Sequence, residues 1–486
     1  MGDEIELKLE LSPDAADKLE RAGLFSAEPR TVRQRSLYFD TPDHDLSKAG
    51  LSLRIRTDGE KTVQTVKADG GKAAGLFVRP EWEQSVKGDV PVLDSSTPIR
   101  TLLGDKADKL TPIFEIIIER RVWDLEDDGT TMEIALDRGH VAVPGERQSP
   151  ICEVELEQKA GSAAALFATA RKMNLHVPVH LNVLSKSERG YRLLGPAPRH
   201  IKAEAMSLDA DMDAATAFQH LARSCLRQFR LNETLLLERH DAEVVHQARV
   251  ALRRLRSALS IHKAMLADDQ SDHLRGELRW LAAKLGEVRN LDVLIDRVPR
   301  NSVEGKLEGA RAEAYASLVT TLMAQRSRDL MIDLAEWISA GGWLKQADGE
   351  DVRHLPISQF AAEALDRLRK KVKKLGAHLA EASDEERHEL RKAAKKLRYA
   401  SEFYASLYKG KREKRRYRQF VDALKQLQDH LGELNDLATA PEVLGELGLH
   451  DVPAAALLLA GEGRDRVLDA AADGYDALVD AKRFWR

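Results

Sequence analysis

Residues 1–200 alternate between apolar and polar side chains in short runs. Seven runs stand out between Gly, Asp and Pro signals: EIELKLEL from Glu4, GLSLRIRT from Gly50, TVQTVKA from Thr62, RPEWEQSV from Arg79, FEIIIERRVW from Phe114, TMEIALDRGHV from Thr131 and ICEVELEQ from Ile151. Alternation with a period of two is typical of strands that bury one face. The pattern predicts an antiparallel sheet of about eight strands.

The pattern changes near LLGPAPRHIKAEAM, residues 193–206, where two prolines and a glycine interrupt regular structure. Beyond this segment, apolar residues recur at helical spacing among Ala, Leu, Arg and Glu. We therefore expect a multidomain protein with a strand-rich α+β domain over residues 1–197, a linker over 198–205 and an all-α domain over 206–486.

The helical part contains a repeat. VHQARVALRRLRSAL, residues 245–259, aligns without a gap with RHELRKAAKKLRYAS, residues 387–401, which lies 142 positions further on. Downstream, LRWLAAKLGEVRNLD at 278–292 resembles LKQLQDHLGELNDLA at 424–438. The repeat predicts two related helical hairpins or bundles that face each other about a pseudo-twofold axis.

Both copies of the repeat carry a histidine followed by cations at matching positions, most of them on one helix face. The matching residues are His246, Arg249, Arg253, Arg254, Arg256 and Arg279 in the first copy, and His388, Arg391, Lys395, Lys396, Arg398 and Lys425 in the second. A solvated face would explain one such stripe, and each histidine could be an interhelical hydrogen-bond partner. Two like-charged faces packed together repel unless a polyanion lies between them. The duplication therefore favours a polyanion site.

The whole chain has a formal net charge of −4, so a polyanion site has to be local. The sequence is 43% hydrophobic and 32% charged, without an apolar run of membrane-spanning length and without a secretory signal at Met1. We expect a soluble cytoplasmic protein. Cys152 and Cys225 are too few and too far apart for a disulfide framework or a thiolate metal site.

Nearly every predicted strand has one charged face. On the first strand Glu4, Glu6 and Lys8 share a face; the others align Arg54 with Arg56, Arg79 with Glu81 and Glu83, and Glu153 with Glu155 and Glu157, while Lys67 adds a further cation. Such a sheet either leaves its charged faces in water or closes around a polar lumen. Cations in a lumen would neutralise phosphate oxygens, and carboxylates beside phosphate require a divalent cation between them. The implied chemistry is metal-dependent phosphoryl transfer.

Residues 1 to about 195 resemble the CYTH family, the triphosphate tunnel metalloenzymes. The resemblance rests on the E-x-E-x-K pattern at Glu4, Glu6 and Lys8, on YFDT at 38–41, and on the paired Arg54 and Arg56. It implies a closed, eight-stranded antiparallel β-tunnel.

The same resemblance implies roles for individual residues. Glu4, Glu6 and Lys8 would be catalytic, and substrate would be bound by Lys8, Arg54, Arg56, Lys67, Glu81, Glu83, Arg120, Asp137 and Lys186. Mg²⁺ or Mn²⁺ would be held by Glu4, Glu6, Glu153 and Glu155. Two assignments stay open. The spacing before Trp123 favours Arg120, whereas strand parity groups Arg121 with Glu115 and Glu119. Glu157 shares the parity of Glu153 and Glu155, or lies beyond the site.

Residues from about 206 to 486 resemble the CHAD domain, the conserved histidine α-helical module. The two H-x-x-R/K-x-x-x-R/K-R/K-L-R stretches and the two L-G-E segments carry this resemblance. It implies a duplicated all-α bundle whose repeated cations line a basic channel that binds inorganic polyphosphate.

Together the two resemblances imply an inorganic triphosphatase, which cleaves tripolyphosphate to pyrophosphate and orthophosphate, joined to a polyphosphate-binding module. The alternatives are a nucleoside or thiamine triphosphatase, an adenylate cyclase of the CYTH type, or a non-catalytic protein directed to polyphosphate granules. Nucleic acid is not an expected partner, because no aromatic residues are interleaved with the cations of either stripe to stack bases.

Overall fold

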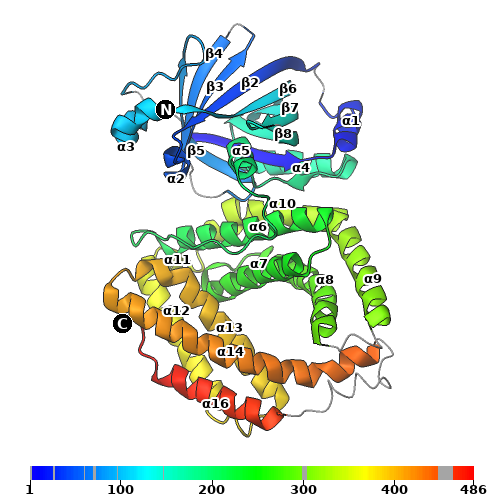
Figure 1. The fold of residues 1–486 in the computed structure, drawn as a ribbon, viewed down its shortest axis with the longest axis vertical. Coiled ribbons are helices and arrows are strands. Elements are labelled where there is room, and N and C mark those ends of the chain that lie inside the picture. The colour runs from blue at the N-terminus through cyan, green and yellow to red at the C-terminus, as the bar shows by residue number, and fades with distance from the viewer. Residues whose placement is uncertain are drawn as a thin grey trace. The chain divides into compact units, whose positions relative to one another are not determined.

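The computed structural model describes residues 3–25, 28–59, 61–68, 73–95, 97–127, 129–145, 147–297, 304–446 and 463–486 (Figure 1). The chain forms two compact units. The first comprises Met1–Ile201 together with Leu322–Gly341, and the second comprises Lys202–Thr321 with Gly342–Arg486. The first unit therefore takes in a segment whose sequence lies within the helical part of the chain.

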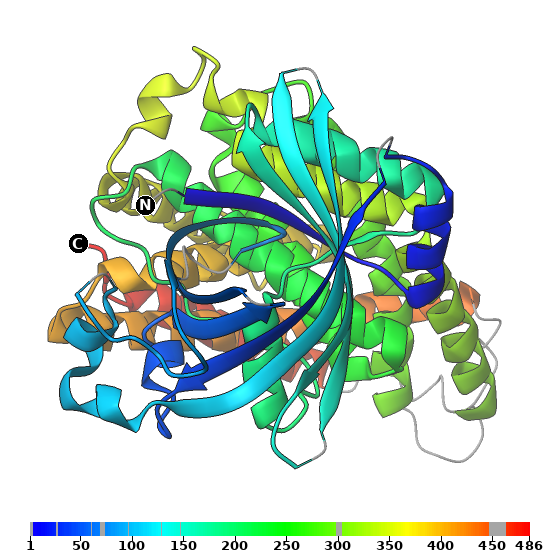
Figure 2. The same cartoon turned by 90° about the horizontal axis from the view of Figure 1, so that it is seen from above.

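A closed antiparallel sheet dominates the first unit (Figure 1 and Figure 2). Its strands are β1 (Asp3–Glu10), β2 (Arg30–Asp40), β3 (Leu51–Asp58), β4 (Lys61–Ala68), β5 (Leu76–Ser85), β6 (Thr111–Asp127), β7 (Thr130–Ala142) and β8 (Gln148–Ala160). Their order is β5-β4-β3-β2-β6-β7-β8-β1, and β1 also pairs with β5, which closes the sheet. The two-residue β9 (His180–Leu181) pairs with the end of β1. The closed eight-stranded fold expected from the sequence is confirmed.

The sequence pattern located every strand of the closed sheet except β2. The middle of β2 is polar on both faces, because Arg33 and Arg35 point outward while Gln34 and Ser36 are buried on the inner side. This part of the sequence therefore lacks the alternation of apolar and polar residues that indicates a half-buried strand.

The apolar faces of the strands point outward and are covered by helices. These helices are α1 (Pro13–Arg21), α2 (Asp45–Lys48), α3 (Ile99–Leu103), η1 (Gly104–Lys109), α4 (Ala163–His176) and α5 (Lys186–Leu194). On β3 and β4, for example, Leu53, Ile55 and Val66 form a buried cluster with Leu46 of α2 and Ile99 of α3. Since Leu53, Ile55 and Val66 occupy the outer face, the alternate positions Arg54, Arg56 and Lys67 are turned inward.

One end of the resulting tunnel is filled by aromatic side chains and α5. Tyr38 and Phe114 are cross-strand neighbours in the same row as the inward-facing Arg54, and their rings stack with centroids 4.7 Å apart. Tyr191 of α5 packs edge-on against Phe114 at 5.4 Å. A Cβ atom at Gly190 would lie 2.2 Å from the Phe114 ring. The absence of a side chain at position 190 therefore allows α5 to approach the tunnel.

The first unit also contains α10 (Gln325–Ala340), which packs on α4 and β9. Arg171 of α4 is 2.8 Å from Asp333 and also contacts Glu336, while Asn174 donates a 2.6 Å hydrogen bond to Asp329. The boundary expected from the sequence, with residues 206–486 all in the helical domain, is therefore wrong for this segment, because helical periodicity does not indicate which unit a helix packs against.

The second unit is helical. Its α-helices are α6 (Ala214–Glu238), α7 (Ala242–Ile261), α8 (Ser271–Arg297), α9 (Glu304–Met323), α11 (Glu350–Arg353), α12 (Ile357–Gly376), α13 (Asp384–Tyr404), α14 (Lys411–Glu446) and α16 (Arg464–Asp480). The aligned stretches of the repeat fall on α7 and α13, and the L-G-E segments fall on α8 and α14. In the first copy α7 packs against α6 and α8, and in the second copy α13 packs against α12 and α14. The helices α7 and α13 also contact each other. The duplicated helical architecture is confirmed. No helix among the described residues is long and apolar enough to cross a membrane.

The close approach of α5 to Phe114 gives a test of this packing. We predict that Gly190→Ala lowers the free energy of unfolding of the first unit by about 1–3 kcal/mol, because the added methyl group overlaps a ring held in an aromatic cluster. Gly195→Ala is the matched control, since its Cβ would have no atom nearer than 4.0 Å. Calorimetric melting of both variants measures the effect; equal stability would contradict the packing.

Candidate functional site

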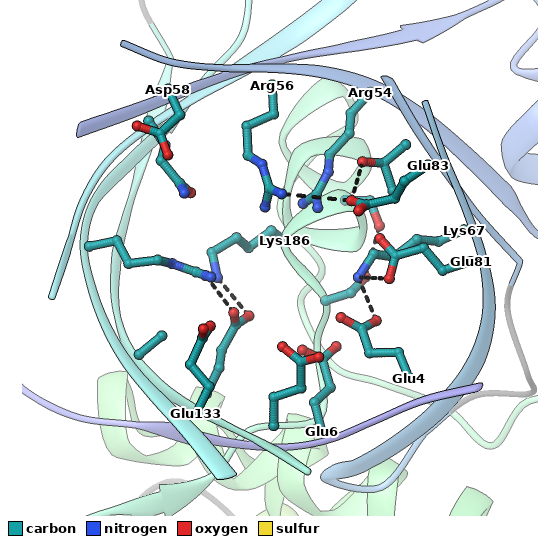
Figure 3. Close-up of a pocket in the computed structure, with 18 of the residues that line it drawn as sticks. Glu4, Glu6, Arg54, Arg56, Asp58, Lys67, Glu81, Glu83, Glu133 and Lys186 are labelled. Carbon is teal, nitrogen blue, oxygen red and sulfur yellow. Dashed lines mark hydrogen bonds and ion pairs between the residues drawn. The ribbon is translucent and has the colours of Figure 1, made fainter. Parts of the chain in front are cut away.

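The charged strand faces enclose a cavity of about 390 Å³ in the first unit (Figure 3). The predicted residues that line it are Glu4, Glu6, Lys8, Arg54, Arg56, Lys67, Glu81, Glu83, Arg120, Glu155 and Lys186. Two more predicted residues, Asp137 and Glu153, are fully buried beside Lys186. The fold therefore brings together all of the tunnel residues that the sequence singled out.

Lys8 lies between two carboxylates of the tunnel wall. Its Nζ atom is 3.0 Å from Glu6 Oε2 and also contacts Glu155 Oε1. Burial opposes the charged form of Lys8, but Glu155 and Glu6 outweigh it and raise the pKa of the ammonium. Burial likewise opposes the ionised form of Glu6, yet Lys8 and its neighbouring cations lower the pKa of that carboxyl to about 2. Both side chains are therefore charged at neutral pH.

A second group of ion pairs ties Glu4 to β4 and β5. Lys67 Nζ contacts Glu4 and is 3.4 Å from Glu81 Oε2. Buried Arg79 contacts Glu6 and lies 3.8 Å from Glu4 Oε2. The sequence analysis aligned Arg79 with Glu81 on one strand face but left it out of the site. The same alternation was the signal that could have included it.

Arg54 and Arg56 point side by side into the tunnel from β3 (Figure 3). The buried Nε atom of Arg54 has no hydrogen-bond partner among the described residues. Arg56 lies 3.7 Å from Glu83, and its pKa is lowered, first by the charge of Arg54 and then by burial. Two positively charged side chains therefore lie side by side in this part of the wall, and this arrangement favours the binding of an anion.

Lys186, the first residue of α5, lies in a part of the tunnel wall that is rich in carboxylates. Its Nζ atom is 2.6 Å from Asp137 Oδ2, 2.6 Å from Glu153 Oε1 and 2.7 Å from Glu155 Oε1. Carboxylate oxygens of these three acids lie within 4.8 Å of one another. Several carboxylates at this spacing are the hard oxygen donors that suit Mg²⁺ or Mn²⁺. Asp137, which the sequence analysis assigned to substrate, thus belongs to a group that could hold a metal.

The position of Lys186 follows from local sequence. Ser185 and Glu188 form a reciprocal capping box, which begins α5 at Lys186. Burial opposes the charge on Lys186, but Asp137, Glu153 and Glu155 outweigh it and raise the pKa of the ammonium.

Two neighbours of Glu153 were missed by the sequence analysis. Asn182 Nδ2 donates a 2.7 Å hydrogen bond to Glu153 Oε2, and Arg189 Nη2 lies 3.8 Å from the same atom. Asn182 follows β9 and Arg189 is on α5, so tertiary packing brings both to the acid, and no periodic pattern marks them.

The structure places Arg120 and Arg121 on opposite faces of β6. Arg120 points into the tunnel and makes hydrogen bonds of 2.7 and 2.6 Å to the two oxygens of Asp137. Arg121 points the other way, contacts Glu20 of α1 and stacks over Trp123. Glu157 lines the cavity and pairs with Lys159 at 2.6 Å.

In the second unit, histidine, arginine and lysine residues of both repeat copies are half-buried on α7 and α13. These residues are His246, Arg249 and Arg253 on α7, and His388, Arg391, Lys395 and Arg398 on α13. Burial and then Arg253 lower the pKa of Arg249 to about 10. Arg249 Nη1 and Arg391 Nε are buried without a hydrogen-bond partner among the described residues.

The glycines of the two L-G-E segments have a role in this arrangement. A Cβ atom at Gly286 of α8 would be 3.2 Å from Arg249 Nη1, and one at Gly432 of α14 would be 3.9 Å from Arg391 Nη2. Each repeat copy therefore seats an arginine of the cationic helix against a glycine of the next helix.

Other predicted cations of the repeat are placed differently. Arg254 is buried, pairs with Glu402 at 2.6 Å and packs on the Phe403 ring, while Lys396 donates a 2.6 Å hydrogen bond to Ser260. His388 Nδ1 is 2.7 Å from Asn435 Oδ1. Arg256, Arg279 and Lys425 are exposed. Arg254 and Lys396 are therefore already engaged within the protein.

Comparison with known proteins identifies a domain family in each part of the chain. Residues 2–191 match the CYTH domain and residues 220–445 match the CHAD domain. The chain is 31% identical over 199 residues to a protein of Haemophilus influenzae named inorganic triphosphatase; the match covers 39% of this chain and 54% of that protein, which is about half its length. It is also 26% identical over 418 residues to an uncharacterized protein of Mycobacterium tuberculosis, with 76% of each chain covered.

Among solved structures, the CHAD domain from the plant Ricinus communis is similar to this chain, with 29% sequence identity and a TM-score of 0.50. The alignment covers 57% of this chain and 97% of the plant domain. The chain therefore consists of a CYTH domain over residues 2–191 followed by a CHAD domain over residues 220–445.

Proposed function

We propose that the first unit is a metal-dependent inorganic triphosphatase, which hydrolyses tripolyphosphate to pyrophosphate and orthophosphate. The observation that carries the proposal is that groups of opposite charge meet at one cavity: Arg54, Arg56 and Glu155 line it, and the buried Asp137 and Glu153 lie beside Glu155. Arg54 and Arg56 offer positive charge to phosphate, while Asp137, Glu153 and Glu155 converge as hard oxygen donors. The similarity to a protein named inorganic triphosphatase supports the same reaction.

In the proposed reaction the acids and cations of the tunnel exchange partners. Phosphate oxygens would be bound by Lys8, Arg54, Arg56, Lys67, Arg120 and Lys186. The carboxylates released from these cations, Glu4, Glu6, Glu153, Glu155 and Asp137, would hold Mg²⁺ or Mn²⁺. The metal would neutralise phosphate charge and lower the pKa of a bound water. In-line attack of water on the terminal phosphorus would form a new P–O bond, break the bridging P–O bond and leave orthophosphate and pyrophosphate, with the proton of the water passing to a product oxygen or to solvent.

The lining favours an inorganic substrate over a nucleotide. Tyr38 is the one aromatic residue among the described residues that line the cavity, so a nucleobase would have little surface on which to stack.

The direct test measures orthophosphate release from tripolyphosphate, ATP and thiamine triphosphate with Mg²⁺, with Mn²⁺ and with neither. We expect tripolyphosphate to be the preferred substrate and metal to be required. Preference for ATP or thiamine triphosphate would favour a nucleoside or thiamine triphosphatase. Formation of cyclic AMP from ATP would favour an adenylate cyclase. Absence of turnover with every substrate would favour a non-catalytic role.

We also propose that the second unit binds long-chain inorganic polyphosphate along α7 and α13. Arg249, Arg253, Arg391 and Lys395 make no salt bridge with any described residue, although all four are half-buried. Glu402 of α13 pairs instead with Arg254 and Arg398. A polyanion would supply the missing negative charge.

The carboxylates of β1 provide the first prediction for catalysis. Glu4→Gln and Glu6→Gln keep the shape of the side chain but remove a charge, so each should lower turnover of tripolyphosphate by at least about a hundredfold. Glu126→Gln, at an exposed position of β6, is the control and should keep wild-type turnover. If both tunnel variants stay near the wild-type rate at saturating Mg²⁺, the proposed site is wrong.

The adjacent arginines of β6 provide a matched pair. Arg120→Ala should lose charge-assisted contacts worth about 1.5–3 kcal/mol, seen as a higher KM and a lower kcat for tripolyphosphate. Arg121→Ala should leave the kinetics unchanged, because its partner Glu20 lies outside the tunnel. Equal losses in the two variants would contradict the assignment.

For the second unit, we predict that the full chain binds long-chain polyphosphate with an affinity that falls steeply as salt rises. Arg253→Ala and Arg391→Ala together should weaken binding more than either change alone, while Lys374→Ala, at an exposed position of α12, should leave it unchanged. Titrating the same protein with single-stranded and duplex nucleic acid gives the comparison. Equal or tighter binding of nucleic acid at equal phosphate concentration would contradict the proposal.

A further inference from the structure

Lys395 is half-buried on α13, one helical turn from Arg391 and from Arg398, and α13 packs against α7, which carries Arg249 and Arg253. The Arg249 Nη1 and Arg391 Nε atoms are buried without a hydrogen-bond partner among the described residues. Burial lowers the pKa of Lys395, and the charges of Arg391, Arg253, Arg398 and Arg249 lower it further, to about 6. Two of these arginines are on α7 and two are on α13, the same helix as Lys395. Each of the leading influences on this lysine therefore acts in the same direction.

The helices α12 and α14 also pack against α13, and their charges are not among the main influences on Lys395. On α14, Asp436 acts on Arg391, and its charge favours the ionised guanidinium. On α12, Lys371 is a further cation, and its charge lowers the pKa of Lys396. Glu402, on α13 itself, is paired with Arg254 and Arg398. No carboxylate among the described residues makes a salt bridge with Lys395.

The buried lysines of the first unit show that burial alone does not produce this state. Lys8 and Lys186 are more deeply buried than Lys395, yet the pKa of each is raised, because two or three carboxylates contact each ammonium. The difference at Lys395 is a missing negative charge. A phosphate chain lying along α7 and α13 would supply that charge from outside the protein.

We propose that Lys395 takes up a proton when the second unit binds polyphosphate, so that affinity for the polyanion falls as pH rises. This inference rests on the proposed polyphosphate binding. Without ligand, Lys395 is mostly neutral above about pH 6; with phosphate oxygens beside it, its pKa returns toward the ordinary value of 10.5.

The sign and size of the pH dependence follow from this shift. Between the free and the bound pKa of Lys395, each complex takes up as much as one proton, and affinity falls by up to about tenfold per pH unit. Below the free pKa the ammonium is already charged, so the contribution of Lys395 to the pH dependence disappears there. Terminal phosphates also titrate, with a pKa of about 6, so the effect has to be measured against a variant.

The test is isothermal titration calorimetry of the full chain with long-chain polyphosphate at about pH 8, in buffers of different ionisation enthalpy. The slope of the observed enthalpy against the buffer enthalpy gives the number of protons taken up. We expect the wild type to take up more protons than Lys395→Arg, by a difference approaching one, because a guanidinium is already charged in the free protein. Lys374→Arg, on the exposed face of α12, is the control and should keep the wild-type slope.

The outcomes separate this inference from the proposed function. Tight binding with equal slopes for the wild type and Lys395→Arg overturns proton uptake at Lys395 and leaves polyphosphate binding intact. Absence of polyphosphate binding by the wild type overturns both. If Lys395→Arg does not fold, Lys395→Met serves instead: its affinity should vary less between about pH 6 and pH 9 than that of the wild type, and an unchanged pH dependence overturns the proposal.

Discussion

Burying a charge is costly unless an opposite charge or a hydrogen-bonding partner accompanies it, and this constraint organises the first unit. Its strands place apolar residues under the covering helices, and many of their charged residues face one cavity. Acids and cations have to alternate around that cavity. Lys8 between Glu6 and Glu155, and Lys186 among three acids, are the result. A ligand of one sign alone would break these pairs without replacing them, whereas phosphate and a divalent cation together would replace both partners.

The second unit meets the same constraint in the opposite way. Its cationic helices carry repeated basic residues, and Glu402 on α13 is engaged with Arg254 and Arg398. Two buried or half-buried lysines illustrate the difference between the units. The pKa of Lys186 in the tunnel is raised, whereas the pKa of Lys395 on α13 is lowered. We interpret the first unit as a site for two ligands of opposite charge, and the second as a site for a polyanion.

Much of this arrangement was predictable because strand periodicity fixes which side chains share a face. That rule grouped Glu4, Glu6 and Lys8 correctly, but it grouped Arg121 with other outward residues without saying which face is the inner one. Contacts made by docking were not predictable. The place of Lys186 depends on Gly190 allowing α5 to approach Phe114, and α10 joins the first unit through pairs such as Arg171 with Asp333. Alignment of the repeat likewise could not show that Arg254 is already paired inside the bundle.

The central claim is that acids and cations of the tunnel exchange partners when substrate and metal bind. A crystal structure of the full chain with Mn²⁺ and a non-hydrolysable triphosphate analogue tests it most directly, since Mn²⁺ is located by its anomalous scattering. The account predicts Mn²⁺ on the tunnel carboxylates, with phosphate oxygens on Arg54, Arg56 and Lys8 in place of carboxylate partners. An analogue bound outside the tunnel, or bound while Lys8 and Lys186 keep all their carboxylate contacts, would contradict it.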